Sequence, residues 1–216
     1  MIRKRQIRSI VLLFLLFSLN SYSQSAAELN SRGVSYLLGE GVRQNQEEAF
    51  QLFKRSAEAG YILAYNNLAN CYFSGEGCSR DLSKAAYWYE KGAQAGNATS
   101  QCSLGECYYW GNGVGKDYSQ AVYWFEQSAK QNYAKSQYCL SVCYNRGQGV
   151  VKDNNLALYW LEKSAKQGYP DAQYQYGNFF KAGIGVRQDM DQAYYWWERA
   201  ARQGHERAAQ ALLESE

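Results

Sequence analysis

Six cysteines are the side chains of this 216-residue chain with the most obvious potential for chemistry. Three of them, Cys71, Cys107 and Cys143, recur at a spacing of 36 residues. The other three, Cys78, Cys102 and Cys139, lie in the same three stretches of the chain. No C-x-x-C pair occurs, so a zinc cluster is disfavoured. Disulfide bonds and buried free thiols are the two alternatives that remain.

The pairing of these cysteines stays open, because six thiols can combine in many ways. Cys139 and Cys143 lie one helical turn apart, near the upper reach of a disulfide bond. A bond between Cys107 and Cys139 would instead join two neighbouring parts of the chain.

Sequence motifs of known catalytic sites are missing. His205 is the only histidine, which excludes a histidine-rich metal site, and we expect it to be a surface or end-capping residue. Neither the G-x-S-x-G nor the S-x-x-K motif occurs. Gly111 and Gly113 before Lys116 do not fit the phosphate-binding pattern G-x-x-x-x-G-K-[ST]. The sequence therefore predicts no enzyme activity and no cofactor.

A repeat of 36 residues organises the rest of the chain. Its alanine series is Ala49, Ala85, Ala121, Ala157 and Ala193. Its turn-glycine series is Gly39, Gly75, Gly111, Gly147 and Gly183. We expect five copies, at residues 28–63, 64–99, 100–135, 136–171 and 172–207, followed by a partial C-terminal cap helix at 208–216.

Each copy is predicted to be a helix-turn-helix unit. In the third copy, Leu104 and Tyr108 share one stripe of a first helix, which ends at Gly111. Asp117 is the expected N-cap of a second helix that buries Trp124. One such pair cannot bury its aromatic face alone, so successive copies must stack.

This unit resembles the Sel-one-like repeat (SLR) family, a relative of the tetratricopeptide repeats. The residues that carry the resemblance in the third copy are Ser100, Leu104, Gly105, Tyr108, Gly111, Gly113, Val114, Asp117, Ala121, Trp124, Phe125 and Ala129. The resemblance implies an all-α, right-handed α-solenoid that holds other proteins on a concave face. Ala69 and Ser141 replace the helix-packing glycine in two copies, and Asn132 replaces a terminal glycine. Cysteine-rich secreted relatives use disulfides, but at other repeat positions.

The N-terminus has the pattern of an export signal. A basic segment, Arg3 to Arg8, precedes a ten-residue apolar run, and Ser21 and Ser23 precede a cleavage site before Gln24. Ten helical residues rise only about 15 Å, too little to span a bilayer. We therefore expect a signal peptide at 1–23, a solenoid at 24–216, and a periplasmic or secreted protein without membrane insertion.

Charge excludes some classes of partner. The chain has 23 basic and 20 acidic residues, and removal of the signal would leave it near neutral. A basic footprint for nucleic acid is therefore absent.

The first helices are expected to line the concave face and to bind a protein or an extended peptide segment. Twelve residues project between their core stripes: Asn66, Asn70, Phe73, Glu106, Tyr109, Trp110, Tyr138, Asn145, Arg146, Tyr174, Asn178 and Lys181. Aromatic side chains and amides suit such binding, although an ordinary solvated face would give the same pattern. A second aromatic stripe, on the second helices, is expected to pack against the next copy rather than to form an outer ladder: Tyr87, Tyr123, Tyr159 and Tyr195.

The sequence therefore predicts an exported, monomeric, non-enzymatic scaffold or adaptor. The alternatives are a cysteine-rich hydrolase directed at cell wall or β-lactams, and a purely structural envelope component.

Overall fold

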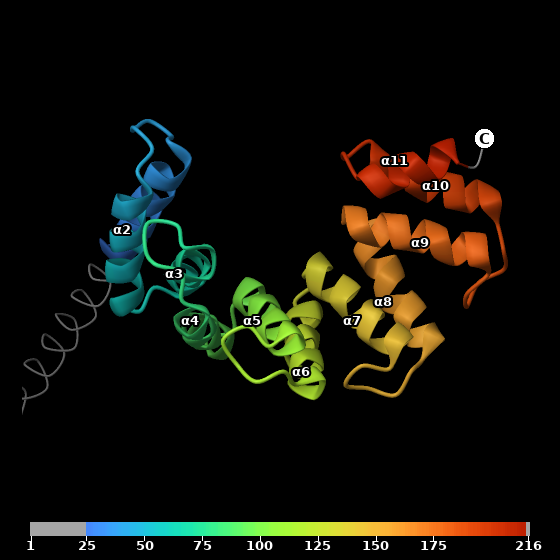
Figure 1. Cartoon of the computed structure of the whole chain (residues 1–216), viewed down its shortest axis with the longest axis horizontal. Coiled ribbons are helices and arrows are strands. Elements are labelled where there is room, and N and C mark those ends of the chain that lie inside the picture. The colour runs from blue at the N-terminus through green and yellow to red at the C-terminus, as the bar shows by residue number, and fades with distance from the viewer. Residues whose placement is uncertain (1–24, 215–216) are drawn as a thin grey trace, which may run out of the picture. The chain divides into compact units, whose positions relative to one another are not determined.

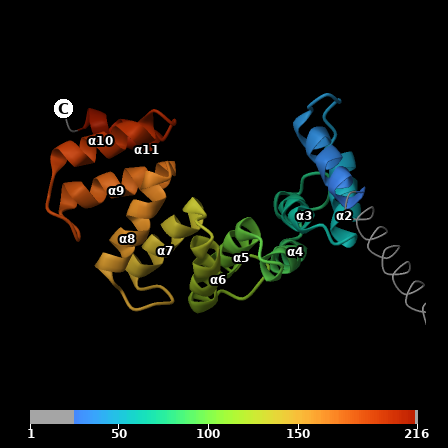
Figure 2. The same cartoon turned by 180° about the vertical axis from the view of Figure 1, so that it is seen from behind.

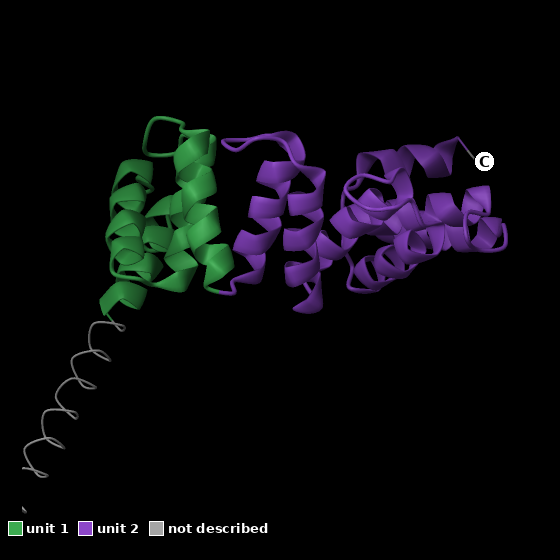
Figure 3. Ribbon diagram, turned by 90° about the horizontal axis from the view of Figure 1, so that it is seen from below, with its two compact units in different colours: residues 1–95 green, residues 96–216 purple. Residues whose placement is uncertain are grey.

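The computed structural model describes residues 25–214, which form helices joined by short loops, with no strand in this range (Figure 1, Figure 2). They divide into two compact units, one ending at Ala95 (unit 1) and one beginning at Gly96 (unit 2) (Figure 3). Unit 1 holds a helix over residues 25–38, then α2 (Gln46–Glu58), α3 (Ile62–Ser74) and α4 (Leu82–Gln94). Unit 2 holds α5 (Ala98–Trp110), α6 (Tyr118–Lys130), α7 (Ala134–Arg146), α8 (Asn154–Lys166), α9 (Pro170–Ala182), α10 (Met190–Ala201) and α11 (Glu206–Leu213).

Consecutive helices pack in pairs, and the pairs stack on one another within each unit. The pairs are α3 with α4, α5 with α6, α7 with α8, and α9 with α10. Within unit 2, α6 packs on α7 and α8 packs on α9, so the neighbouring pairs are in contact. The predicted all-α solenoid of stacked helix-turn-helix repeats is confirmed. The predicted signal peptide at 1–23 lies outside the described residues.

The helix ends follow the capping residues expected from the sequence. The side chains of Asn45, Asp117 and Asp189 accept hydrogen bonds from backbone N–H groups in the first turns of α2, α6 and α10. The first helices of the copies end at left-handed glycines, such as Gly111 with φ +77°. Asn132 stands where the other copies have a glycine after the second helix, and it has the left-handed φ of +65° that this position requires. Asparagine adopts this region more readily than most residues with a side chain.

The core of each unit is shared between neighbouring copies. In unit 2, Phe125 of the third copy and Leu140 of the fourth belong to one buried cluster, against which Trp160 packs. Gly105 makes this packing possible, because a Cβ there would lie 2.6 Å from the Phe125 ring. The fourth copy carries the smaller Leu161 at the ring position and Ser141 at the glycine position.

Two kinds of hydrogen bond also join the two helices of one hairpin, each across thirty residues of chain. The hydroxyls of Ser56, Ser128 and Ser164 donate to the carbonyl oxygens of Ala26, Ala98 and Ala134 at 2.6–2.7 Å. The side-chain amides of Gln131, Gln167 and Gln203 donate to the side-chain oxygens of Gln101, Gln137 and Gln173 at 2.6–2.8 Å. These bonds satisfy polar groups that packing would otherwise leave buried and unpaired.

The loops also rest on the preceding copy. A side chain at Gly149, whose φ is +76°, would overlap the carbonyl group of Tyr118 at the start of α6. In unit 1, Gly77 lies in the same way against the carbonyl group of Gln46. These two positions combine a left-handed backbone with a close approach, so only glycine fits.

Candidate protein-binding groove

A groove of about 240 Å³ opens in unit 2 between α5, α7 and the residue that precedes α9. Its lining residues are Glu106, Tyr109, Trp110, Phe125, Lys135, Tyr138, Cys139, Val142, Arg146 and Tyr169. Half of them are aromatic, and the polar groups are confined to a few side chains. Small apolar hollows with few polar groups are typical of sites that bind side chains or small ligands.

Trp110 forms the exposed aromatic wall of the groove. It is the last residue of α5, and 64% of its side-chain surface is accessible. Its ring meets the ring of Tyr109 edge-on, with centroids 4.7 Å apart. Tyr109 is nearly buried, and its hydroxyl donates to Gln148 Oε1 at 2.6 Å. Trp110 is therefore free to contact a partner, whereas Tyr109 supports it from below.

One side of the groove carries an ion pair. Lys135 Nζ lies 2.7 Å from a carboxylate oxygen of Glu106. Burial opposes the charged form of Lys135, but the neighbouring Glu106 outweighs it and raises the pKa of the ammonium group. Lys135 and Glu106 thus neutralise each other and leave no net charge on this side.

Arg146 lies at the opposite side, at the end of α7. Its guanidinium group contacts the Tyr109 hydroxyl at 3.5 Å. In the range 25–214, no carboxylate lies within ion-pair distance of this group. The groove therefore carries an unneutralised positive charge beside its aromatic wall.

Tyr138 and Tyr169 close the groove toward α9, with ring centroids 5.4 Å apart. Burial is the main cause that raises the pKa of Tyr138 to about 12. Burial also raises the pKa of Tyr169, and the adjoining Asp171 carboxylate adds to the effect. Both phenols are neutral at physiological pH and serve as apolar walls with a polar tip.

Five of the twelve residues proposed from the sequence lie together in this groove: Glu106, Tyr109, Trp110, Tyr138 and Arg146. Asn145 lies on the same helix as Arg146 but does not line the groove. Three others on α9 have different contacts. Asn178 accepts a hydrogen bond from the Trp197 indole, Lys181 lies over the Trp197 ring, and Tyr174 stacks on His205.

The remaining three residues of that set belong to unit 1. The side-chain oxygen of Asn70 accepts a 2.6 Å hydrogen bond from the Tyr89 hydroxyl, and the Arg80 guanidinium lies over the Phe73 ring. The side-chain oxygen of Asn66 is buried without a hydrogen-bond partner. None of these three residues lines either of the two hollows found among residues 36–79 of unit 1.

Sequence reasoning missed five lining residues, Phe125, Lys135, Cys139, Val142 and Tyr169, of which it had considered Cys139 only as a possible disulfide partner. Phe125 was assigned to the core, which it also serves. A signal for Tyr169 existed, because it is the N-cap residue of α9 at the same repeat position as Tyr61, Tyr133 and His205.

The cysteines are all free thiols in the structure. Cys139 lines the groove, and the neighbouring Cys102 side chain, together with burial, raises the pKa of its thiol. Neither of the two pairs considered from the sequence is a disulfide in the structure. In unit 1 the Cys78 thiol donates to the carbonyl oxygen of Cys71 at 3.5 Å. Burial raises the pKa of Cys71, Cys107 and Cys143 to about 12. These three are inert, packed thiols at neutral pH.

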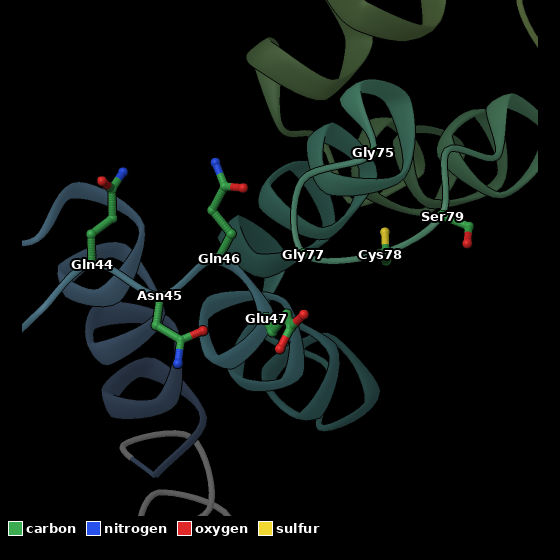
Figure 4. A pocket seen from close by; sticks show the side chains of 8 residues that line it. All are labelled: Gln44, Asn45, Gln46, Glu47, Gly75, Gly77, Cys78 and Ser79. Atoms are coloured by element: carbon green, nitrogen blue, oxygen red, sulfur yellow. The ribbon is translucent and has the colours of Figure 1, made fainter.

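A larger hollow of about 750 Å³ lies in unit 1, where the loop through Gly75, Gly77 and Cys78 passes the start of α2 (Figure 4). Its side chains are mainly polar, and they include Gln46 and Glu47. The hollow is a consequence of loops stacking between copies, and no cluster of aromatic or charged groups points into it. It is a weaker candidate for a binding site than the groove in unit 2.

The tyrosine stripe on the second helices corrects one expectation. Tyr123, Tyr159 and Tyr195 of unit 2 are 47–50% exposed and meet the following tryptophan of the same helix edge-on. They form an outer ladder and do not pack against the next copy. Their position two residues after the buried alanine, about 200° around the helix, explains the exposure.

Comparison with known proteins agrees with this architecture. The family model described as Sel1 repeat matches residues 32–61, 62–97, 98–133, 134–169 and 170–205. The chain belongs to the Sel1 repeat family. Proteins with Sel1 repeats are generally non-catalytic scaffolds that take part in protein interactions. The comparison with curated proteins found no match.

Two solved structures with Sel1-type repeats are similar to the chain. A Sel1 repeat protein from Oxalobacter formigenes is 32% identical, with a TM-score of 0.80 over 85% of this chain and 75% of its own. A protective antigen of uropathogenic Escherichia coli with an SLR fold is also 32% identical, with a TM-score of 0.76 over 85% of this chain. The present chain covers only 39% of that antigen. An immunity protein from Pseudomonas aeruginosa, 20% identical with a TM-score of 0.58, shares the fold.

The helices were also compared with the dimensions of a bilayer. Across residues 25–214, none combines the length and the apolar character that a membrane span requires.

Proposed function

We propose that this Sel1 repeat protein is an exported, monomeric, non-enzymatic scaffold that binds a protein partner through the groove of unit 2. The observation that carries the proposal is Trp110, a large aromatic side chain left 64% exposed beside a concave, aromatic-lined hollow. Exposed tryptophans beside a pocket are typical anchors of protein interfaces.

The size of the groove favours a peptide segment over a cofactor. A volume of about 240 Å³ lies below the range of about 300–1,000 Å³ that is usual for small-molecule sites. One or two partner side chains would fill it, with the rest of the segment lying along α5 and α7. The apolar rings supply contact area, and the charged groups at the sides set the orientation.

Export is part of the proposal because of the basic and apolar segments that precede residue 24. In an oxidising compartment we expect Cys102 and Cys139, whose side chains are neighbours, to form a disulfide. The two thiols would lose two protons and two electrons to the disulfide of an exported thiol oxidoreductase, which is reduced to its dithiol. Trypsin mapping of alkylated native protein should show the linked peptides, and six alkylated cysteines would contradict this.

The groove is tested by quantitative capture from the native source with three versions of the full chain. Wild type should recover a partner in stoichiometric amount, and Trp110→Ala should recover less than a tenth of it. Tyr123→Ala is the matched control, because it removes an aromatic side chain at a residue that is 50% exposed and does not line the groove. Equal recovery by wild type and Trp110→Ala would contradict a role for the groove.

The absence of enzyme activity is tested separately with a chromogenic β-lactam. We expect no hydrolysis above buffer at micromolar protein. Hydrolysis that a single substitution in the groove abolishes would contradict the scaffold and favour the hydrolase.

A further inference from the structure

We infer that the groove selects a partner segment in which an acidic side chain lies next to an apolar or aromatic anchor. The inference rests on the proposed function and adds to it the chemistry of the partner. It is carried by the distribution of charge around Trp110 and Tyr138.

The carboxylates of Glu106 and Asp171, which lie near the groove, already have partners within the chain. Lys135 is held by Glu106 at 2.7 Å, so neither is available to a partner without breaking that pair. Asp171, near Tyr138, is held by the Tyr169 hydroxyl and by His205 Nε2, which lies 3.3 Å away. Additional basic side chains on a partner would therefore find no free carboxylate here.

Two cations near Tyr138, in contrast, have no carboxylate within ion-pair distance in the part of the chain that the structure describes. They are Arg146 at the end of α7 and Arg207 in the first turn of α11, and both are exposed. Both lie within electrostatic reach of the Tyr138 phenol. Of these two guanidinium groups, that of Arg146 lines the groove together with Tyr138.

A carboxylate is the partner group that complements this arrangement. The guanidinium fork can hold a carboxylate through two parallel hydrogen bonds, which fixes its direction as well as its charge. Arg146 also lines the groove together with Trp110 and Val142, so an acid bound to it would have its neighbouring side chain at the apolar wall. The anchor supplies contact area, and the acid supplies selectivity.

Nucleic acid fits the same face less well. Phosphate backbones are bound by several cations arranged along a path, whereas the groove itself has one cation without a carboxylate partner, Arg146, and also carries the carboxylate of Glu106. A side-chain carboxylate within a peptide needs one guanidinium and a nearby hollow, which is what the groove offers.

The experiment selects peptides of twelve residues from a random phage-displayed library on the full chain. Enriched sequences are synthesised with acetylated and amidated ends, each beside a version with Asp and Glu replaced by Asn and Gln. Binding is measured by calorimetry. We expect the amide version to bind wild type about 10- to 150-fold more weakly, the range of one hydrogen bond to a charged group.

Three variants locate the effect. With Arg146→Gln, the acidic and amide peptides should bind equally, because the group that distinguishes them is gone. Arg187→Gln, which removes an exposed arginine in the loop before α10, should keep the full discrimination. Trp110→Ala should weaken both peptides equally, because it removes the shared anchor site.

The outcomes separate this inference from the proposed function. Peptides that need Trp110 but bind equally well as acid and amide would overturn the acidic preference and leave the protein-binding groove standing. Peptides that bind only with a free C-terminal carboxylate would also overturn it, in favour of a chain end. If no enriched peptide depended on Trp110, the proposed groove itself would be contradicted.

Discussion

The side-chain amide of Gln167 donates a hydrogen bond to the side-chain oxygen of Gln137, 2.6 Å away and thirty residues earlier in the chain. Gln137 is 1% exposed, and its own amide donates to the Asn132 side chain at 3.1 Å. The same glutamine pair recurs in the other copies of unit 2. A buried amide that is fully paired ties the first helix of a copy to the end of its second helix, and its loss leaves polar atoms without partners.

We therefore expect Gln137→Ala to destabilise the protein by about 1–3 kcal/mol, the range for stranding a buried hydrogen-bonding group. Gln51→Ala is the control, because Gln51 is exposed on α2, and it should change stability by less than about 0.5 kcal/mol. Urea unfolding followed by circular dichroism measures both. Equal midpoints for the two variants would show that the buried amide contributes no net stability.

Gly105 should not tolerate a side chain. A Cβ there would lie 2.6 Å from the Phe125 ring and 3.2 Å from the carbonyl oxygen of Ala121, so Gly105→Ser should cost about 1–3 kcal/mol through overpacking. Adding Phe125→Leu reproduces the pair Ser141 and Leu161 of the fourth copy and should recover part of that loss. The coupling free energy from the four unfolding curves is the measurement, and strictly additive effects would contradict the packing argument.

His205 is confirmed as the end-capping residue expected from its position. Its Nδ1 accepts a 3.1 Å hydrogen bond from the Ala208 backbone N–H at the start of α11. His205→Ala should therefore cost about 1 kcal/mol, and His205→Asn, which keeps an N-cap acceptor, should cost clearly less. Hydrogen exchange of the α11 amides reports the change locally. Faster exchange in the Asn variant than in the Ala variant would contradict a capping role.

Stability should fall at alkaline pH in reducing buffer. The thiols of Cys71, Cys107 and Cys143 have a pKa of about 12 in the folded chain, against 9.0 without burial. Above pH 9 the unfolded chain therefore loses protons that the folded chain keeps, and the free energy of unfolding decreases by about 1.4 kcal/mol per pH unit for each thiol. Above pH 10, Tyr138 and Tyr176 add to the loss, because burial raises the pKa of both to about 12.

Urea midpoints from pH 8 to pH 11 test this slope. Cys143→Ala should be less stable at pH 8 but should show a shallower decline, since one thiol no longer titrates. A decline as steep as that of wild type would mean that Cys143 does not contribute to the pH dependence.

The backbone architecture was predictable because each of its requirements selects a residue type. The caps Asn45 and Asp117 and the left-handed Gly111 are local features that a sequence displays directly. Their recurrence every 36 residues then identifies the stacked hairpins. The glutamine pairs follow the same period and could have been found, but a polar residue with helical spacing does not reveal that it is buried.

Only half of the groove's lining residues were predicted from the sequence. The 36-residue spacing identifies equivalent positions in the repeats, but it does not say which contacts the side chain at each position makes. Asn178 and Trp110 were both predicted to project into the partner-binding face. Asn178 instead accepts a hydrogen bond from the Trp197 indole, whereas Trp110 is largely exposed. Tyr109 was predicted to contact the partner, but it is only 7% exposed, and its hydroxyl donates a hydrogen bond to Gln148. Such differences arise from individual side-chain contacts between copies, which repeat spacing does not encode.

The serine and glutamine bonds of unit 2 always join residues thirty positions apart, as between Ser164 and Ala134. A duplicated stretch of 36 residues would therefore bring both the donor and the acceptor of each bond with it, whereas a single residue added within a hairpin would change their spacing. Gene duplication is thus the easy way for such a chain to grow. Each extra copy would lengthen the binding surface by roughly one helix width, about 10 Å.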